Sequence, residues 1–372
     1  MRIGLDVSVL SDKQKTGIAV YTYSLIDALL KINRKDEFVL FGISTLETFD
    51  YLKNLEFKKY PNVKLVINKL PAKLFRTVFI LWQKLNWPLI ETFIGDVDIF
   101  HSFNWFFPPQ KNGKKVATVF DMTPTLFPQF HHQRTVQLEK IRLERIRKYA
   151  DLVISISENS RSDFLKFSPK SNVGVIYPAA DQLDLTYSSE KIKKVLKKYN
   201  LKRGYFLSVA TLEPRKNLKV LLNVYLRGQF DKELVIVGAK GWGDDEIHKL
   251  VMTNHQVRML GYIPDEELPI LYRGASCFIY PSFYEGFGLP VLEAMTFSIP
   301  TICSNTSSLT EVGGDAVLYI DPKSEESIKE AIGKIENDDN LKKRLIEKGL
   351  QQADKFSWRK SAEKLNLLYQ QL

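Results

Sequence analysis

Short apolar runs alternate with longer stretches of helical periodicity along the whole chain. A short apolar run bounded by turn residues predicts a buried strand, and an amphipathic stretch between two such runs predicts a helix. Regular alternation of the two is typical of parallel α/β sheets. The predicted strands are Arg2–Val9, Glu37–Ile43, Val63–Asn68, Val97–His101, Lys115–Phe120, Leu152–Ser157, Tyr205–Val209, Leu234–Val237, Val257–Leu260, Cys277–Tyr280, Thr301–Cys303 and Val317–Ile320. Two similar groups of strands predict two doubly wound, Rossmann-like parallel-sheet domains.

The boundary between the two domains is predicted after Pro178, where a polar stretch over residues 179–190 follows the last apolar residues of the first group. We therefore expect an N-terminal domain over residues 1–178 and a C-terminal domain over residues 179–355. Residues 356–372 predict a separate amphipathic helix, with Ser357 as its N-cap.

The composition agrees with this two-domain organisation. The chain has 372 residues, more than one hydrophobic core usually organises, and its 44% apolar and 26% charged residues are those of an ordinary globular protein. No apolar run is long enough for a membrane-spanning helix, and the first residues enter a strand without the layout of a signal peptide. Cys277 and Cys303 lie in strand-like runs, which favours a reducing, cytoplasmic location. No spacing of cysteine and histidine indicates a metal site.

The positive charge is concentrated in the first half of the chain. Residues 1–180 carry 26 Lys and Arg against 17 Asp and Glu, whereas residues 181–372 carry 27 against 26. A basic N-terminal half fits attraction to anionic lipid, to a phosphate-bearing acceptor or to nucleic acid. It fits a merely soluble, lysine-rich surface equally well.

One stretch, Cys277–Pro300, combines a strand, a glycine turn and a helix start. Ligands of open α/β sheets bind at the carboxyl ends of the strands, glycines let a ligand approach the backbone, and a helix N-terminus favours an anion. The alternative is an ordinary connection with solvated glutamates. The candidate ligand-binding residues are Glu285, Gly286, Phe287, Gly288, Leu289 and Glu293.

A second strand–loop–helix connection carries two adjacent cations. The strand Tyr205–Val209 runs into Thr211-Leu212-Glu213-Pro214-Arg215-Lys216-Asn217, and a helix is predicted to begin near Asn217. Arg215 and Lys216 before a helix N-terminus suit a diphosphate, because Arg binds phosphate oxygens in a bidentate manner and Lys adds a point charge. The glycine-rich stretch after Leu234–Val237 lacks the Gly-x-Gly-x-x-Gly spacing, so it is only a weak indication of dinucleotide binding.

Both connections resemble the donor-site motifs of the retaining, nucleotide-sugar-dependent glycosyltransferases of family four. The resemblance covers most of the chain, and it implies the GT-B fold, in which two Rossmann-like domains face a cleft and the terminal helix returns to the first domain. It implies that Glu285 holds hydroxyls of the donor sugar, that Glu293 holds the ribose, and that Arg215 and Lys216 hold the diphosphate. Many members carry a further Arg where this chain has Ala210.

The same resemblance implies contacts from three other positions. Tyr262 and Ile263, after the predicted strand Val257–Leu260, are the candidates for the nucleotide base, with core packing as the alternative for Tyr262. Gly17, in the segment Lys15–Tyr21, resembles the glycine loop that faces the donor phosphates. The family's usual second glycine is Ala19 here.

Two residues after strands of the first domain complete the candidate catalytic set. Asp121 matches a family segment that normally reads His-Asp, but Phe120 stands in place of the histidine. Asp121 is expected to orient the acceptor or contact the sugar, or else to cap the next helix. His101 ends another strand, where it is either a site residue or a structural histidine.

The resemblance implies a mechanism without cofactor or metal. Arg215, Lys216 and the N–H groups near Gly288 and Leu289 would stabilise the departing diphosphate, and the leaving phosphate would take the acceptor proton. The pattern most resembles bacterial mannosyltransferases that use GDP-mannose in surface polysaccharide assembly (O-antigen, capsule or exopolysaccharide), with a glycan or polyprenyl-diphosphate-linked acceptor. UDP-glucose, UDP-N-acetylglucosamine and dTDP-rhamnose remain open as donors, as does a sugar-nucleotide epimerase.

Two basic and aromatic segments add a membrane interpretation. The helix predicted over Gln133–Tyr149 is rich in Arg and Lys, and Leu74–Trp87 mixes aromatic and basic residues. This composition fits peripheral contact with an anionic membrane, which would be the cytoplasmic face of the inner membrane. A solvated helix face and a buried helix are the alternatives. No aromatic-basic module of a recognised nucleic-acid-binding type is present, so we expect no nucleic-acid partner.

Overall fold

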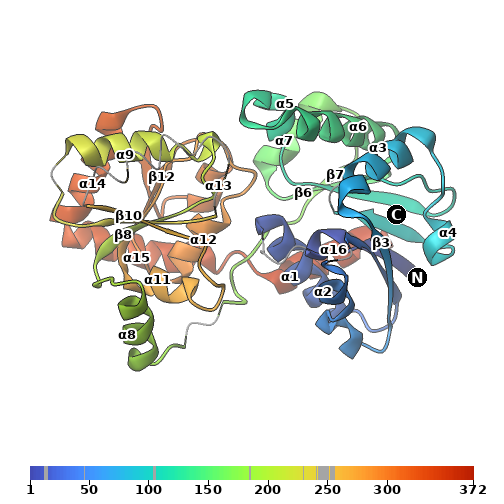
Figure 1. The fold of residues 1–372 in the computed structure, drawn as a ribbon, viewed down its shortest axis with the longest axis horizontal. Helices are drawn as coiled ribbons and strands as arrows, with labels where there is room; N and C mark the ends of the chain where they lie inside the picture. Colours follow the sequence, from blue (N-terminus) through green and yellow to red (C-terminus); the bar gives the residue numbers. More distant parts are fainter. Residues whose placement is uncertain are drawn as a thin grey trace. The chain divides into compact units, whose positions relative to one another are not determined.

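The computed structural model describes residues 1–11, 16–45, 47–103, 106–183, 186–228, 230–239, 241, 251 and 256–372, without the side chains of Tyr51, Lys73, Phe75 and Arg76. Tertiary contacts divide the chain into two compact units. The N-terminal unit comprises Met1–Pro178 and Ser357–Leu372, and the C-terminal unit comprises Ala179–Phe356 (Figure 1).

The N-terminal unit is built on a seven-stranded parallel sheet in the order β3-β2-β1-β4-β5-β6-β7. Its strands are β1 (Arg2–Asp6), β2 (Glu37–Thr45), β3 (Val63–Leu70), β4 (Ile99–Ser102), β5 (Lys114–Val119), β6 (Leu152–Ser155) and β7 (Val173–Val175). Its helices include α1 (Gly17–Ile32), α2 (Phe49–Lys53), α3 (Phe75–Leu85), α4 (Glu91–Ile94), α5 (Thr123–Leu126), α6 (Gln133–Tyr149), α7 (Glu158–Phe167) and α16 (Trp358–Gln370). The six strands predicted for this half are present. The edge strand β7 was not predicted, because three residues with a central glycine carry almost no periodic signal.

The C-terminal unit is built on a six-stranded parallel sheet in the order β10-β9-β8-β11-β12-β13. Its strands are β8 (Tyr205–Val209), β9 (Leu234–Val237), β10 (Val257–Gly261), β11 (Ala275–Tyr280), β12 (Thr301–Ser304) and β13 (Leu318–Ile320). Its helices include α8 (Ser189–Lys198), α9 (Leu218–Arg227), α11 (Leu268–Gly274), α12 (Leu289–Thr296), α13 (Leu309–Gly313), α14 (Glu325–Asn337) and α15 (Asp339–Ala353). In each unit, the chain order of the first six strands across the sheet is 3-2-1-4-5-6, which is the doubly wound order. The prediction of two Rossmann-like sheets is confirmed.

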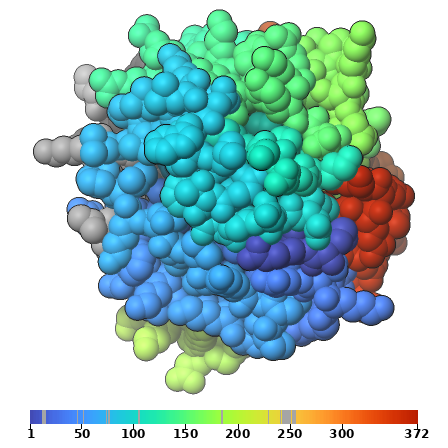
Figure 2. Space-filling model, turned by 90° about the vertical axis from the view of Figure 1, so that its right-hand side faces the viewer, coloured from blue at the N-terminus to red at the C-terminus, as the bar shows by residue number. Residues whose placement is uncertain are grey.

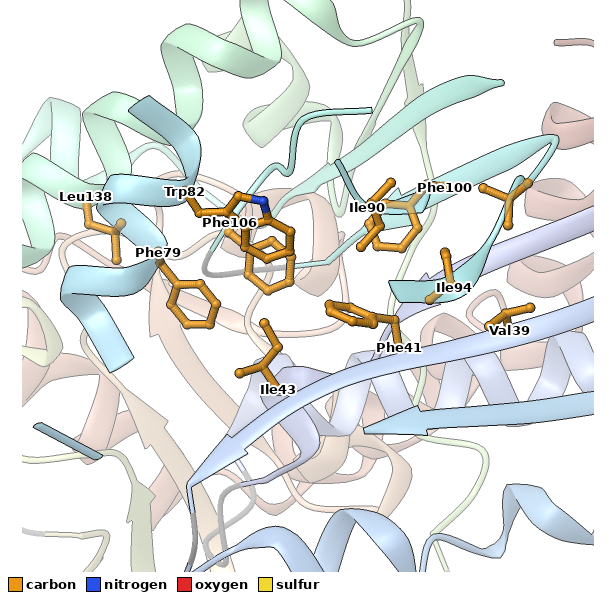
Figure 3. Packing of buried hydrophobic residues seen from close by; sticks show 11 residues of the cluster. Val39, Phe41, Ile43, Phe79, Trp82, Ile90, Ile94, Phe100, Phe106 and Leu138 are labelled. Carbon is orange, nitrogen blue, oxygen red and sulfur yellow. The ribbon is translucent and has the colours of Figure 1, made fainter. Parts of the chain in front are cut away.

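An aromatic core fills one side of the N-terminal sheet. Phe41 of β2 lies among Trp82 of α3, Phe100 of β4 and Phe106, with ring centroids about 6.3–6.4 Å away in edge-on arrangements (Figure 3). Phe79 of α3 stacks on Phe106 at 4.8 Å. Edge-on and offset ring pairs of this kind fix the position of α3 on the sheet.

The last helix, α16, packs in the N-terminal unit against α1. Trp358 lies edge-on to Tyr21 of α1 at 5.7 Å, and Asn366 accepts a hydrogen bond from the Asn33 amide. Ser361 donates a hydrogen bond to the Tyr177 carbonyl oxygen. The red C-terminal residues therefore lie beside blue residues of the first part of the chain (Figure 2). Among the residues that the structure describes, no helix is both long and apolar enough to cross a bilayer.

Candidate functional site

The topological switch point of the C-terminal sheet lies between β8 and β11, where the strand order reverses. The two strands are parallel neighbours, so their carboxyl ends lie at the same edge of the sheet. Ligands of doubly wound sheets bind at this place. The loop after β8 leads through the short helix η5 (Pro214–Lys216) into α9, and the loop after β11 leads into α12.

Three charged side chains from the two loops meet at the switch point. The two carboxylate oxygens of Glu285 lie 2.9 Å from Nη1 of Arg215 and 2.8 Å from Nζ of Lys216. Lys216 also donates a hydrogen bond to the Tyr280 hydroxyl at 2.8 Å, and Arg215 bonds to the carboxylate of Glu213 at 2.5 Å. The sequence-predicted diphosphate residues and the sequence-predicted sugar carboxylate thus form one cluster.

The cluster is largely buried, and its charges compensate one another. Burial opposes ionisation of Glu285, but the Arg215 and Lys216 charges outweigh that cost and lower the pKa of this carboxyl to about 2. Burial and the adjacent Arg215 charge lower the pKa of Lys216, against the pull of Glu285. We take the Lys216–Glu285 pair as ionised, because Nζ lies at hydrogen-bonding distance from both the carboxylate and a neutral tyrosine hydroxyl. The carboxylates of Glu213 and Glu285 balance the charges of Arg215 and Lys216, and these two cations are the groups of the cluster that can bind an anionic ligand.

Side-chain hydrogen bonds fix both loops. Asn217, at positive φ, donates to the carbonyl oxygens of Pro281 and Pro322, so it ties the Arg215 loop to the end of β11. The hydroxyl of Ser308 donates to the carbonyl oxygens of Glu285 and Phe287 at 2.8 Å. These bonds order the turn that carries Glu285.

The turn residues divide into backbone positions and a core residue. Gly288 has φ +106° and precedes α12, and a Cβ there would lie 2.6 Å from the side chain of Leu309. Gly286 is buried and Leu289 half-buried at the start of the helix. Phe287 is buried and lies edge-on to Phe356 at 5.5 Å, so its side chain packs inside the unit. The Phe287 side chain therefore belongs to the core, and its backbone is the part that lines the turn.

Glu293 lies on α12 and receives a hydrogen bond of 2.9 Å from the Tyr272 hydroxyl of α11. Burial raises the pKa of Glu293 to about 7, against the Tyr272 hydrogen bond, which lowers it. Tyr272 in turn stacks on Phe297 at 5.3 Å, which fixes the orientation of its ring. Glu293 is therefore a carboxyl group held in place and poised between its two protonation states near neutral pH.

The two base-binding candidates differ in exposure. Both follow β10, at the sheet edge that carries the cluster. The ring of Tyr262 is 44% exposed, so core packing does not account for it, whereas Ile263 is buried. A base-contacting role for the Ile263 side chain is therefore not supported.

Sequence reasoning missed several residues that hold the cluster together. The Tyr280 hydroxyl binds Lys216, and Glu213 binds Arg215. In the sequence, Tyr280 was only a residue of a predicted strand, and Glu213 was only part of a motif. Gly238 also has a role: a Cβ there would lie 1.8 Å from the Ala210 carbonyl oxygen, so only glycine lets the loop after β9 approach the loop after β8. The signal for Gly238 was the glycine-rich stretch after β9.

His101, at the end of β4, is fully buried in the N-terminal unit. Its Nδ1 lies 2.5 Å from the Tyr369 hydroxyl of α16, its Nε2 lies 2.8 Å from the Thr118 hydroxyl of β5, and Phe103 stacks on the ring at 4.1 Å. Burial lowers its pKa to about 3. The structural alternative for His101 is favoured, because both ring nitrogens are used to join β4, β5 and α16.

Asp121 and Gly17 lie at the starts of helices. Oδ1 of Asp121 accepts hydrogen bonds from the N–H and the hydroxyl of Thr123, the first residue of α5, at 2.8 and 2.6 Å, whereas the N-cap of this helix is Met122. Gly17 is exposed in the first turn of α1, whose N-cap Thr16 accepts a hydrogen bond from the Ala19 N–H. Lys15, from the same predicted loop, lies outside the described residues.

The basic and aromatic segments divide between core and surface. Phe79 and Trp82 of α3 are buried, and Arg142 of α6 is buried and paired with Glu139, so these three do not form a docking surface. Leu81 and Trp87 are exposed. As for metals, the described residues contain no group of three or more His, Cys, Asp or Glu side chains that could hold an ion.

Comparison with known proteins adds the family. The profile of the family described as "Glycosyltransferase Family 4" matches residues 15–182, and that of "Glycosyl transferases group 1" matches residues 188–352. The chain is 33% identical to O-antigen chain mannosyltransferase B of Escherichia coli over 92% of this chain and 93% of that protein. It is 25% identical to O-antigen chain mannosyltransferase RfbU of Salmonella typhimurium over 87% and 88% of the two chains. It also matches the serotype-specific mannosyltransferase WbdA of Escherichia coli at 27% identity, where it spans 32% of that protein's length.

Solved structures show the same fold. The chain resembles sucrose-phosphate synthase of Thermosynechococcus elongatus with a TM-score of 0.76 at 19% identity, over 100% of this chain and 98% of that one. It resembles HepE of Anabaena, solved in complex with UDP-glucose, with a TM-score of 0.73 at 16% identity over 100% of both chains. The fold is GT-B.

Proposed function

The chain belongs to the glycosyltransferases that combine family 4 and group 1 domains, and we propose that it is a retaining mannosyltransferase with GDP-mannose as its donor. The acceptor in this proposal is a glycan or a lipid-linked glycan of a surface polysaccharide such as an O-antigen. The names of the Escherichia coli and Salmonella relatives support the sugar and the pathway. The two free, buried cysteines are compatible with a cytoplasmic location.

The proposal rests chiefly on the meeting of Arg215, Lys216 and Glu285 at the switch point. The bonds from Glu285 to both cations are shorter than 3 Å, so all three groups can contact one small molecule. A nucleotide diphosphate sugar needs cations beside its phosphates and a carboxylate beside its hydroxyls. The cluster supplies both within one unit.

In the proposed reaction, the chain's own charges stabilise the leaving group. As the bond from the anomeric carbon to the phosphate oxygen breaks, negative charge grows on the diphosphate and the sugar gains oxocarbenium character. Arg215, Lys216 and the N-terminus of α12 would stabilise that negative charge. The leaving phosphate oxygen takes the acceptor proton, and the new glycosidic bond forms on the face that the phosphate leaves.

Two carboxyl groups orient the donor in this proposal. Glu285 accepts hydrogen bonds from hydroxyls of the sugar, and Glu293 accepts them from the ribose. Tyr272 already holds Glu293 in one orientation, which lowers the entropic cost of binding. The proposal needs no metal ion, since two side-chain cations compensate the diphosphate.

Calorimetry with GDP-mannose, UDP-glucose, UDP-N-acetylglucosamine and dTDP-rhamnose tests the donor. We expect GDP-mannose to bind at least about tenfold more tightly than the others, which corresponds to about 1.4 kcal/mol. Tighter binding of another sugar nucleotide would replace the donor assignment. Conversion of the donor in the absence of acceptor would indicate an epimerase instead.

The stereochemistry is tested separately. NMR of the product formed with an acceptor glycan should show the α-anomeric configuration of the donor. A β-linked product would overturn the retaining mechanism without affecting the donor assignment.

A further inference from the structure

The guanidinium of Arg215 contacts oxygen atoms of both loops at the switch point. Its Nη1 donates to the Tyr284 carbonyl oxygen at 2.6 Å and lies 2.9 Å from the Glu285 carboxylate. Its Nη2 donates to the Glu213 carboxylate at 2.5 Å. Tyr284 and Glu285 belong to the loop after β11, whereas Glu213 lies on the same loop as Arg215, two residues before it. Glu213 is therefore a local partner of the guanidinium, and the other two are distant in sequence.

The two carboxylates leave the cluster without excess positive charge. Arg215 and Lys216 contribute one positive charge each, and Glu213 and Glu285 contribute one negative charge each. A diphosphate that binds to the two cations brings further negative charge into this largely buried place, where like charges repel more strongly than in water. Binding of a diphosphate is therefore tightest when one of the two carboxylates withdraws.

Glu285 is the carboxylate that is firmly held. Its two oxygens contact both cations, and its side chain is only 9% exposed. Its N–H donates to the Ser307 hydroxyl at 2.9 Å, and its carbonyl oxygen accepts from the Ser308 hydroxyl at 2.8 Å. If this carboxylate withdrew, two buried cations would lose a shared counter-charge, which is unfavourable.

The Glu213 carboxylate can withdraw more easily. Its side chain is 19% exposed, and among the residues that the structure describes, only Arg215 forms an ion pair or hydrogen bond with it. The backbone of Glu213 is held separately, because its N–H donates to the Thr211 carbonyl oxygen at 2.8 Å and its carbonyl oxygen accepts from the Lys216 N–H at 3.0 Å. Rotation of the side chain toward water would therefore leave the loop in place.

We propose that Glu213 is an exchangeable counter-ion. It gives up Arg215 to the diphosphate of the donor, and after transfer it takes the guanidinium back and so promotes release of the nucleoside diphosphate. Glu213 is thus a positioning residue, which holds Arg215 between the two loops and competes with phosphate oxygens for it. The inference rests on the proposed function, because it takes the cluster as the diphosphate site.

Calorimetry with GDP tests the exchange, because GDP is the product of the proposed reaction and carries the diphosphate. Glu213→Gln removes the charge and keeps an acceptor oxygen for Arg215. We expect this variant to bind GDP at least about fivefold more tightly than the unmodified chain, because repulsion between the carboxylate and the phosphates is removed. In the transfer assay, the inhibition constant of GDP should fall by a similar factor. Loss of a merely structural contact would not raise affinity.

The matched control is Glu233→Gln. Glu233 directly precedes β9, at the amino edge of the same sheet and therefore opposite the cluster. Its side chain is 25% exposed and pairs with Arg258, so its surroundings are similar to those of Glu213. This variant should bind GDP like the unmodified chain. Thermal unfolding of both variants checks that the fold is intact.

Unchanged or weaker GDP binding by folded Glu213→Gln would overturn the proposal, because this variant loses only the charge. Equally tighter binding by Glu233→Gln would overturn it as well, since the gain would then not depend on the place of the carboxylate. The double variant Arg215→Ala/Lys216→Ala separates these failures from failure of the proposed function. If it binds GDP as tightly as the unmodified chain, the diphosphate assignment itself is wrong. If it binds GDP weakly and Glu213→Gln shows no gain, only the exchange is excluded.

Discussion

Polar side chains stand at strand ends in both sheets, but the two units use them differently. In the C-terminal unit, Glu285 lies between Arg215 and Lys216, in a cluster of ionised side chains from two loops. In the N-terminal unit, His101 is sealed between Thr118 and Tyr369. A place at the ligand-binding edge of a doubly wound sheet is therefore not sufficient for a site role. The two places differ in the kind of group: the C-terminal cluster joins ionised side chains of two loops, whereas His101 is bonded to two neutral hydroxyls.

Among the variants that test this difference between the two units, Glu285→Gln should have the largest effect. We expect transfer to fall by about a hundredfold or more, because a neutral amide no longer compensates the cations or accepts from the sugar in the same way. The free energy of unfolding should also fall by about 3 kcal/mol, since two buried cations lose their counter-charge. Initial rates and urea unfolding measure the two effects.

Glu325→Gln is the matched control for Glu285→Gln, because Glu325 pairs with Arg227 on the surface of the same unit. It should change stability by less than about 0.5 kcal/mol and leave transfer unaffected. Full activity of Glu285→Gln would show that the site lies elsewhere.

The double variant Arg215→Ala/Lys216→Ala removes the cations and keeps the carboxylate. Affinity for a nucleoside diphosphate should fall by about 3 kcal/mol or more, as expected for two lost charge-assisted interactions. Calorimetry measures it, with Arg227→Ala as the control for loss of a surface cation. An affinity equal to that of the unmodified chain would remove the diphosphate assignment.

His101→Asn tests the structural side of the comparison. We expect the free energy of unfolding to fall by about 2 kcal/mol, because Thr118 and Tyr369 lose buried partners, while kcat of the remaining folded enzyme is unchanged. Loss of kcat in a stably folded variant would restore His101 to the catalytic set.

The decrease of the free energy of unfolding at acid pH provides a second test of His101. Its pKa is about 3 in the folded state and 6.5 ordinarily, so the unfolded chain takes up the proton first as pH falls. This stabilising contribution is complete above pH 6.5 and is lost between pH 6.5 and 3, at a slope of up to about 1.4 kcal/mol per pH unit. In His101→Asn, this contribution to the slope should be absent.

Glu293→Gln should raise the free energy of unfolding, whereas His101→Asn lowers it, and the change should be smaller. The pKa of Glu293 rises from 4.5 to about 7 on folding, so the folded state favours the protonated carboxyl, and stability is lost as pH rises through this window. Without nucleotide, Glu293→Gln should therefore match the unmodified chain near pH 4.5 and be about 1–2 kcal/mol more stable near pH 8. Thermal unfolding over this pH range measures it, and a difference independent of pH would contradict the assignment.

The smallest expected effect is that of Asp121→Ala. Loss of the bonds to Thr123 should cost about 1 kcal/mol of stability, the usual net value of an intramolecular hydrogen bond. Asp121→Asn keeps one acceptor oxygen and should cost less. If Asp121→Asn lowers transfer by more than about tenfold without changing stability, Asp121 acts on the acceptor as well as on the helix.

The sequence was sufficient for most of the fold because its signals are local. Buried parallel strands are short apolar runs, and glycines with a following proline indicate loops such as Glu285–Gly288. The strand β7 was not predicted, and the sequence did not show that the ring of Phe287 is buried. A three-residue strand has too few positions for a pattern, and a phenylalanine in a glycine turn does not reveal in sequence which way it points.

The amino-acid sequence by itself determined two parallel α/β units and the strand–loop–helix connections that carry Arg215, Lys216 and Glu285, since apolar periodicity and turn chemistry act over a few residues. Only the tertiary structure decided what these residues meet. The order of strands brings β8 beside β11, which joins groups 69 positions apart into one cluster, and the return of α16 brings Tyr369 to His101 across 268 positions. Such contacts follow from how whole elements pack on a sheet, and no local pattern encodes them.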